Sequence, residues 1–349
     1  MTGLPLQLAR FRFDFEVETP LHLHYYAGSQ LRGAFGHALR RTACVTRQKD
    51  CKACPLYRGC AYPEVFETPA PEDHRLQRFS QVPNPYVIEP PPLGARDYPP
   101  GATLSFHLVL MGRALRYLPL IVYAWQRALE RHAGLGGGSA RLAAVAYVPP
   151  EGPEQGLFAE GTLRAPELAP VPAPALDGAA RLRFSTPLRL QQRGQALGHA
   201  MRARDLLMAL ARRYWLLAEF HQDLRPAVDF RALAEQAGTV ALEGELLWRD
   251  WHRYSSRQGQ PMVLGGVIGT VTLRGELAPF QGLLAAGQWT HLGKNASFGL
   301  GQYRLASGIM DPVNASMPVP QNTLPAPPEP GGKPPRNPLN QWRLPTRSL

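Results

Sequence analysis

The order of strand-like and helix-like segments constrains the fold of this chain more than any single residue does. Residues 8–18 alternate apolar and charged side chains, as a half-buried strand does, and lead to a helix-like segment at 29–42. Residues 181–190 alternate likewise and lead to a second helix-like segment at 197–220. Each half closes with a helix, a glycine-rich loop and an apolar run, at 117–133, 134–138 and 142–148 in the first half. This repeated plan predicts an α+β protein with two tandem ferredoxin-like (RRM-like) βαββαβ domains.

The loop that closes the second half is the strongest candidate for a ligand contact. Residues 291–301 read His-Leu-Gly-Lys-Asn-Ala-Ser-Phe-Gly-Leu-Gly and follow a helix-like segment at 279–288. Glycine accepts positive φ and carries no Cβ, so the backbone of such a loop can approach a phosphate, and the lysine adds positive charge. A tight structural turn is the alternative. We predict that the loop binds nucleic-acid phosphates through His291, Gly293, Lys294, Asn295, Gly299 and Gly301.

Composition divides the chain into two domains and a connection. Its 349 residues are enough for two hydrophobic cores. We place the first domain at 1–150, a Pro- and Ala-rich linker at 151–178 and the second domain at 179–306. Residues 307–349 contain eleven prolines in 43 residues and almost no periodic pattern, so we expect a disordered Pro-rich C-terminal tail.

Charge and hydropathy restrict the classes of partner that the chain is expected to bind. The formal net charge is +11, and arginine supplies most of the positive side chains. Guanidinium groups match phosphate oxygens with two parallel hydrogen bonds, so the charge and the glycine-rich loops together favour a nucleic acid. No apolar run approaches the roughly 20 residues that span a bilayer, and the first residues do not resemble a secretory signal. We expect a cytoplasmic protein without a membrane partner.

All four cysteines of the chain lie within seventeen residues, with the spacing C-x6-C-x2-C-x5-C. In a cytoplasmic protein such a cluster favours a metal site over disulfides. Four thiolates suit tetrahedral zinc in a closed, structural site, here within an insertion at about 44–92 of the first domain. An iron–sulfur cluster and a set of buried thiols are the alternatives. The predicted ligands are Cys44, Cys51, Cys54 and Cys60.

Histidines are the candidates for acid–base chemistry. In the helix-like segment 30–41 the apolar residues form one stripe, and His37 lies on the opposite side. Gly33, one turn earlier, leaves that surface open, and Arg41 follows one turn later. An exposed imidazole beside a cation can act as a general base, although an ordinary surface histidine is the alternative. The other candidate histidines are His22, His24, His199 and His291.

Other motifs limit the chemistry. The sequence contains no P-loop, H-E-x-x-H or G-x-S-x-G motif and no acidic cluster for two magnesium ions. Residues 251–257, which include Arg257, mix aromatic and polar side chains as an RNA-stacking hairpin does, with a solvated hairpin as the alternative. Cleavage of RNA without a metal remains compatible with these residues, since a base, cations and an acid are all present.

Several segments resemble the CRISPR-associated endoribonucleases of the RAMP superfamily that process precursor CRISPR RNA. The similar segments are 31–40, 54–56, 86–91, 254–258, 265–269 and 293–301. The resemblance implies two ferredoxin-like domains and metal-independent cleavage within repeat RNA, with a 2′,3′-cyclic phosphate and a 5′-hydroxyl as products. It also implies that CRISPR repeat RNA or the mature CRISPR RNA is the partner, together with other Cas subunits of an effector complex.

The same resemblance suggests the catalytic residues. The family commonly places its catalytic histidine on the first helix, where this chain has His37. A tyrosine and a lysine often assist in the family; this chain lacks a lysine near that helix, so Arg41 or Tyr25 would substitute. The alternative function is a non-catalytic RNA-binding RAMP subunit of a CRISPR effector complex. A weaker alternative is a zinc-dependent DNA-binding module.

Overall fold

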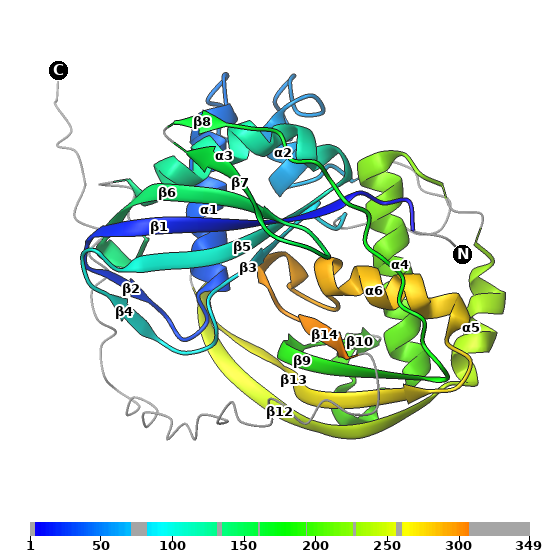
Figure 1. The fold of residues 1–349 in the computed structure, drawn as a ribbon. Helices are drawn as coiled ribbons and strands as arrows, with labels where there is room; N and C mark the ends of the chain where they lie inside the picture. The colour runs from blue at the N-terminus through cyan, green and yellow to red at the C-terminus, as the bar shows by residue number, and fades with distance from the viewer. Residues whose placement is uncertain are drawn as a thin grey trace, which may run out of the picture. The chain divides into compact units, whose positions relative to one another are not determined.

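The first half of the chain forms a six-stranded antiparallel sheet with the strand order β3-β5-β1-β6-β7-β8. The structure is a computed structural model that describes residues 4–70, 82–130, 135–159, 161–192, 194–225, 228–255 and 260–306. In sequence, β1, helix α1, β3, β5, helix α3 and β6 follow one another, which is the predicted βαββαβ order (Figure 1). The strands are β1 (Leu8–Thr19), β3 (Tyr86–Glu89), β5 (Thr103–Met111), β6 (Ser139–Val148), β7 (Gln155–Ala159) and β8 (Thr162–Leu163).

The first half also contains a small second sheet, helices and 3₁₀ turns. A separate two-stranded sheet pairs β2 (Leu21–Leu23) with β4 (Arg96–Tyr98). The helices are α1 (Gly28–Ala43), α2 (Ala61–Phe66) and α3 (Leu118–Leu129), with 3₁₀ turns at Gly112–Tyr117 and Leu135–Gly137. The segment predicted as a linker, 151–178, contains β7 and β8, which extend the first sheet by pairing beside β6.

The second half repeats the plan with a four-stranded sheet of order β12-β13-β9-β14. The order β9, α4, β12, β13, α6, β14 is again βαββαβ, with α5 added after α4. The elements are β9 (Ala179–Leu188), α4 (Ala203–Gln222), α5 (Phe230–Gly238), β12 (Ala241–Ser255), β13 (Gln260–Arg274), α6 (Gln281–Thr290) and β14 (Tyr303–Ala306). Smaller elements are β10 (Gln191–Gln192), β11 (Gln195–Ala196) and 3₁₀ turns at Gly198–Ala200, Ala278–Phe280 and Ala296–Phe298. The α+β class and the repeated element order are therefore confirmed.

The helix predicted at 197–220 begins later than its apolar pattern indicated. His199 lies in a separate 3₁₀ turn, and α4 begins only at Ala203. The cause is a cap: Arg202 is extended, and its backbone N–H donates to the Asp205 carboxylate at 2.9 Å. His199 therefore does not occupy the first turn of a long helix.

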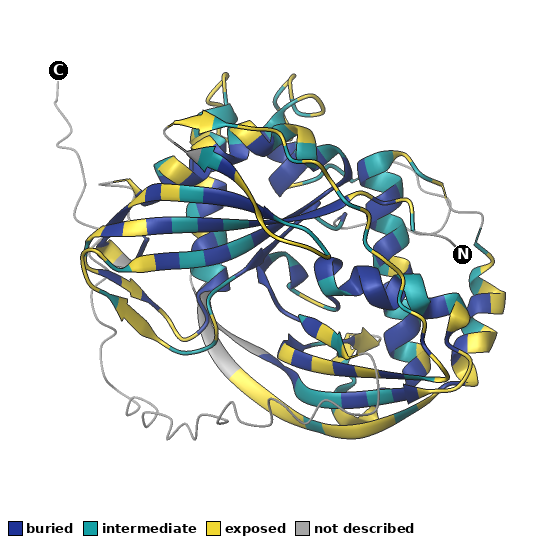
Figure 2. Cartoon of the chain, viewed as in Figure 1, coloured by how far each residue is buried: buried dark blue, intermediate teal, exposed yellow. Residues whose placement is uncertain are grey.

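Strand alternation gives the first sheet two buried faces. Ala9, Phe11, Phe13 and Phe15 of β1 face a core formed with α1 and α3, where Phe35 and Trp125 stack at 5.0 Å. The opposite face of the sheet is also covered. On that face Val87 of β3 and Val109 and Met111 of β5 join the core that contains residues of α4 and α6. Figure 2 shows the buried residues on the elements between the two sheets and the exposed ones along β12. Residues up to Ser307 thus form one compact unit, and the domain boundaries near 150 and 179 stay a prediction.

Two further predictions concern membrane-spanning helices and the C-terminal tail. Among the described helices, none has both the length and the hydropathy needed to cross a bilayer. The predicted disordered tail, 307–349, lies outside the described residues.

His221 is a titratable group buried between the halves. It lies near the end of α4, and its Nε2 is 2.7 Å from the carbonyl oxygen of Pro83. A Cβ on Gly112 would lie 2.3 Å from the His221 carbonyl oxygen, so the two backbones are in close contact. Burial lowers the pKa of His221 to about 4, which keeps the imidazole neutral and able to donate its Nε2 proton to Pro83.

This burial predicts a pH-dependent stability. In the unfolded chain the His221 pKa returns to about 6.5, so between pH 6.5 and 4 the unfolded state takes up a proton that the folded state does not. The contribution of neutral His221 to stability is complete above pH 6.5 and falls as the pH drops towards 4. In His221→Gln, which keeps an N–H for Pro83, the loss of unfolding free energy between about pH 7.5 and 4.5 should be about 2.5 kcal/mol smaller than in wild type. Urea unfolding at the two pH values measures it, and equal losses in both proteins would exclude a role for His221.

Candidate functional site

Helix α1 presents a buried stripe and an exposed strip. Leu31, Phe35, Ala38 and Leu39 are buried in the first core. Arg40 and Arg41 lie in the last turn, where cations complement the negative end of the helix dipole. Packing of the apolar stripe fixes the rotation of the helix, so the residues on its opposite side face away from the core.

His37 lies on this exposed strip, as the sequence predicted. Its side chain is exposed, and so is that of Arg41 one turn later. One turn earlier, a Cβ added to Gly33 would find no atom within 4 Å, so the surface beside His37 is open. The structure therefore brings together His37 and Arg41 along a surface that a ligand can reach.

Tyr25 does not lie on the helix that carries His37 and Arg41. It precedes α1 and is 36% exposed. Gly28, the first residue of α1, is nine residues before His37, which corresponds to about 14 Å along the helix axis. Of the two residues predicted as assistants of His37, Arg41 lies one turn from it on α1, and Tyr25 lies before the start of the helix.

A pair of histidines directly precedes Tyr25 in sequence. His22 and His24 point to the exposed face of β2, and their rings meet edge to face at 5.5 Å. Nδ1 of His22 lies 2.7 Å from the Asp97 carboxylate on β4. The Gln30 side chain bonds the backbone of both histidines and so attaches this strand to α1. Burial, and then the neighbouring His22, lower the pKa of His24. The predicted orientation of the two histidines is confirmed.

His291 has a structural position in the glycine-rich loop. It is fully buried at the end of α6, where its Nε2 lies 3.0 Å from Glu89 on β3. Glu89 also forms two 2.9 Å contacts with Arg10 of β1. The predicted contact of His291 with RNA is wrong for this arrangement, because a fully buried imidazole cannot reach a ligand at the surface. Its role is to join the loop to the first half of the chain.

Packing explains the loop glycines. Gly293, Gly299 and Gly301 all have positive φ, and added Cβ atoms would lie 2.6 Å from the Arg189 carbonyl oxygen, 2.6 Å from that of Ile88 and 1.8 Å from that of Leu292. Several loop amides are also occupied: those of Leu292, Lys294 and Gly301 donate to backbone carbonyls within 3.2 Å. The glycines thus serve close packing of the loop against the protein, which is the structural alternative to a phosphate cradle. Lys294 is exposed, and Asn295 is partly buried in a left-handed conformation.

The loop also packs on the start of α1. The Tyr26 hydroxyl donates to the Phe298 carbonyl, and a Cβ on Gly28 would lie 2.1 Å from the same oxygen. The Arg32 guanidinium lies 4.4 Å from the ring centroid of Phe66 and 5.7 Å from that of Phe298. The helix that carries His37 and the loop that carries Lys294 are therefore held together by direct contacts.

Arg10 and Glu89 were not predicted from the sequence as residues that position the loop. Alternation in β1 marked Arg10 as a solvent-facing charge, because the pattern alone does not show that a second layer covers that face. A signal was available for Glu89: it ends a short apolar run, Tyr86–Glu89, in which every residue is buried. Such a run is typical of a strand covered on both faces.

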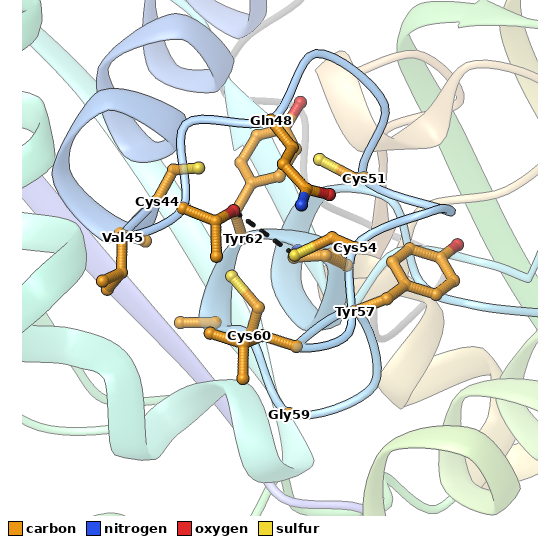
Figure 3. Close-up of a pocket in the computed structure, with 14 residues that line it drawn as sticks. Cys44, Val45, Gln48, Cys51, Cys54, Tyr57, Gly59, Cys60 and Tyr62 are labelled. Atoms are coloured by element: carbon orange, nitrogen blue, oxygen red, sulfur yellow. Dashed lines mark hydrogen bonds between the residues drawn. The ribbon is translucent and has the colours of Figure 1, made fainter.

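The four cysteines line one cavity of about 240 Å³. All four are free thiols, and Figure 3 shows Cys44, Cys54 and Cys60 pointing towards the same space, with Cys51 at its edge. Across the described ranges, no three His, Cys, Asp or Glu side chains lie close enough as placed to hold a metal ion. The arrangement is a shared thiol cavity rather than a closed coordination sphere.

Arg257 lies outside the described residues. Backbone pairing of β12 with β13 confirms the hairpin that was predicted around it.

Comparison with known proteins gives a family for the second half. Residues 182–303 match the family described as CRISPR-associated endoribonuclease Cas6, and residues 5–170 match a family described as an N-terminal domain. The resemblance inferred from the sequence is therefore confirmed. The segment that matches the Cas6 family contains the second sheet, α4, α6 and the glycine-rich loop, while His37, Arg41 and the cysteines lie in the segment that matches the N-terminal domain.

Solved structures share the fold across both halves. The product complex of a Thermus thermophilus Cas6 aligns with a TM-score of 0.52 and 17% identity, covering 86% of this chain and 99% of that one. A partial Cas6-RT-Cas1–Cas2 complex aligns with a TM-score of 0.51 and 16% identity, covering 87% of this chain and 47% of the other. An uncharacterized protein of Archaeoglobus fulgidus is 28% identical over 102 residues, 29% of this chain. That alignment spans about a third, 34%, of the curated relative.

Proposed function

We propose that this chain is an endoribonuclease that binds CRISPR repeat RNA and cleaves precursor CRISPR RNA. The observation that carries the proposal is the Cas6 endoribonuclease domain at 182–303. The fold shared with a Cas6 product complex over 86% of the chain and the net charge of +11 support it. The test is incubation of the full chain with the repeat RNA of the neighbouring CRISPR array, in EDTA, with a substrate carrying a 2′-deoxy nucleotide at the cut as the control.

The chemistry follows from the exposed strip of α1. His37 as general base removes the proton of a 2′-hydroxyl, and the oxygen attacks the adjacent phosphorus. The Arg41 guanidinium stabilises the charge of the pentacovalent phosphate. The bond to the 5′-oxygen breaks, water protonates that oxygen, and the products are a 2′,3′-cyclic phosphate and a 5′-hydroxyl. Neither residue needs a metal ion for its part, so we expect cleavage in EDTA.

Tyr25 takes a different role in this proposal. Tyr25 lies before Gly28, the first residue of α1, and about 14 Å of helix axis separate Gly28 from His37, so we assign Tyr25 to RNA binding with His22 and His24 rather than to the same phosphate. A tyrosine ring and imidazoles at the surface can stack on unpaired bases. The repeat RNA would then lie along α1 from the β2–β4 pair towards Arg41.

Lys294 supplies a separable test of RNA binding. It is the exposed cation of the glycine-rich loop, whose backbone is engaged in internal packing. Lys294→Ala should weaken repeat binding. It should also reduce the magnitude of the slope of log K against log salt by about one, which corresponds to the loss of one phosphate contact. Lys294→Arg is the matched control and should keep the slope. Fluorescence anisotropy across a salt series measures both, and identical slopes in all three proteins would remove Lys294 from the interface.

The second candidate function is an RNA-binding subunit without nuclease activity. The position of Tyr25 outside α1 favours it, because only His37 and Arg41 then share one face of the helix. Such a subunit could work with other Cas proteins, and a Cas6 protein occurs in a solved assembly with reverse transcriptase, Cas1 and Cas2. Tight repeat binding without any cleavage by wild type would select this candidate over the nuclease.

A further inference from the structure

The cysteine cavity lies at the end of the helix that carries His37. Cys44 ends α1, and its backbone N–H donates to the Arg40 carbonyl at 2.9 Å. Cys60 immediately precedes α2. Cys51 and Cys54 lie in the intervening loop, where the Cys54 N–H donates to the Cys51 carbonyl at 3.1 Å. The cavity therefore collects thiols from two helix ends and one turn.

Hydrogen-bond donors already face two of these sulfur atoms. The backbone N–H of Arg47 donates to Sγ of Cys44 at 3.2 Å. The Thr46 hydroxyl lies 3.4 Å from Sγ of Cys54 (Figure 3). Donors of this kind stabilise thiolates and orient them, as the outer partners of metal ligands do.

The loop itself is fastened to α1 by a guanidinium. Arg40 donates to the carbonyl oxygens of Gln48 and Lys49 at 2.8 and 2.7 Å, and it lies 5.8 Å from the Tyr62 ring centroid. The backbone around the cavity is thus held in place independently of the thiols. Rotation of the cysteine side chains into about 240 Å³ of free space is the movement that would gather the sulfur atoms.

We propose that Cys44, Cys51, Cys54 and Cys60 bind one zinc ion that fixes the C-terminal end of α1. Four thiolates complete a tetrahedral shell, so the ion has no open position and takes no part in cleavage. It links the end of α1 to the start of α2, whose Phe66 already packs at 5.9 Å from Phe35. That the ion also positions His37 and Arg41 rests on the proposed function, whereas zinc binding itself does not.

Metal content of the full chain tests the site without RNA. Protein purified under reducing conditions, and the same protein titrated with zinc against a chromogenic chelator, should each contain one zinc per chain. Cys51→Ser/Cys54→Ser should bind none. Val45→Ser, in the same loop and 85% exposed, is the matched control and should bind one. Failure of wild type to bind zinc in both preparations would overturn the proposal. Iron with inorganic sulfide, or disulfides found by mass spectrometry in freshly purified protein, would overturn it equally.

The effect on α1 has its own readout. Removing zinc by chelation should increase hydrogen exchange at the last turn of α1 and in α2, and lower Tm by on the order of 5 °C. The Cys51→Ser/Cys54→Ser protein should show the same exchange with or without chelator. If zinc is bound but its removal leaves hydrogen exchange at α1 unchanged, the ion does not fix the end of the helix. A failure of zinc to fix α1 is distinguishable from an absence of nuclease activity, because hydrogen exchange is measured on the protein alone, without RNA.

Discussion

Replacing His37 with alanine should lower the rate of repeat-RNA cleavage by about 10²–10⁴-fold while leaving repeat binding intact. The imidazole is exposed beside Gly33 and Arg41, and no element of the core depends on it. Loss of the general base therefore removes proton abstraction without disturbing the fold. Single-turnover cleavage in EDTA and anisotropy on the same RNA measure the two effects separately.

Gln126→Ala provides a matched control for this experiment. Gln126 is exposed on α3, the neighbouring helix of the same layer, and has no place in the proposed site. Its cleavage rate should equal that of wild type. Added imidazole should partly restore cleavage by the His37→Ala protein, since a free base can enter the space left by the side chain. Wild-type rates in His37→Ala would assign the base elsewhere, with His22 and His24 as the next residues to replace.

The rate of wild type should also rise from acid to neutral pH, because a general base accepts a proton only in its neutral form. The His37→Ala protein should lack this rise. A pH profile that is unchanged by the substitution would contradict the role of His37 even if the rate fell.

The element order was predictable because periodicity reports which face of a strand or helix is apolar. β1 and α1 were each predicted to within one residue at either end, as both have one face in a continuous core. The α4 helix began six residues later than predicted, because the cap at Arg202 is a local hydrogen bond that hydropathy does not register. The strip around His37 was likewise visible, since helical geometry alone sets which residues share a face.

The glycine-rich loop could be predicted from the sequence only in part. Its glycines predicted positive φ and a close approach of the backbone, and the positive φ of Gly293, Gly299 and Gly301 confirms the first. Composition could not tell whether the close approach is to a ligand or to the protein itself. The carbonyls of Ile88 and Arg189 that decide the matter are more than 100 residues away in sequence. The contact of His291 was mispredicted, and Arg10 was not singled out, because burial by a distant segment leaves no mark on the local pattern.

Glu89→Gln should lower the free energy of unfolding by about 3–5 kcal/mol, because it leaves the buried Arg10 guanidinium without a counter-charge. Burial alone would raise the pKa of Glu89, yet Arg10 and His291 hold it below its usual range, so the carboxylate is ionised. Burial lowers the pKa of His291, which is therefore neutral and donates from Nε2. Of the three groups, only Arg10 and Glu89 are then charged, and they neutralise one another.

The network also links the halves of the chain. Arg10 donates to the Gln288 carbonyl on α6 at 2.9 Å and lies 4.8 Å from the Trp289 ring centroid. Removing the charge of Glu89 thus weakens contacts of β1 and β3 with α6 and with the loop behind it. Since the stabilised form is the carboxylate, this contribution is present above the ordinary glutamate pKa of 4.5 and is lost as the pH falls below it.

Urea unfolding near neutral pH measures the effect, with Glu16→Gln as the matched control. Glu16 lies on the same sheet and pairs with Arg141, but both side chains are more than half exposed. Water screens such a pair, so its loss should cost at most about 1 kcal/mol. Equal, small losses in both variants would mean that the Arg10–Glu89–His291 network is solvated in solution. A large loss confined to Glu89→Gln would establish that this buried ion pair, rather than the glycines alone, fixes the loop against the first half of the chain.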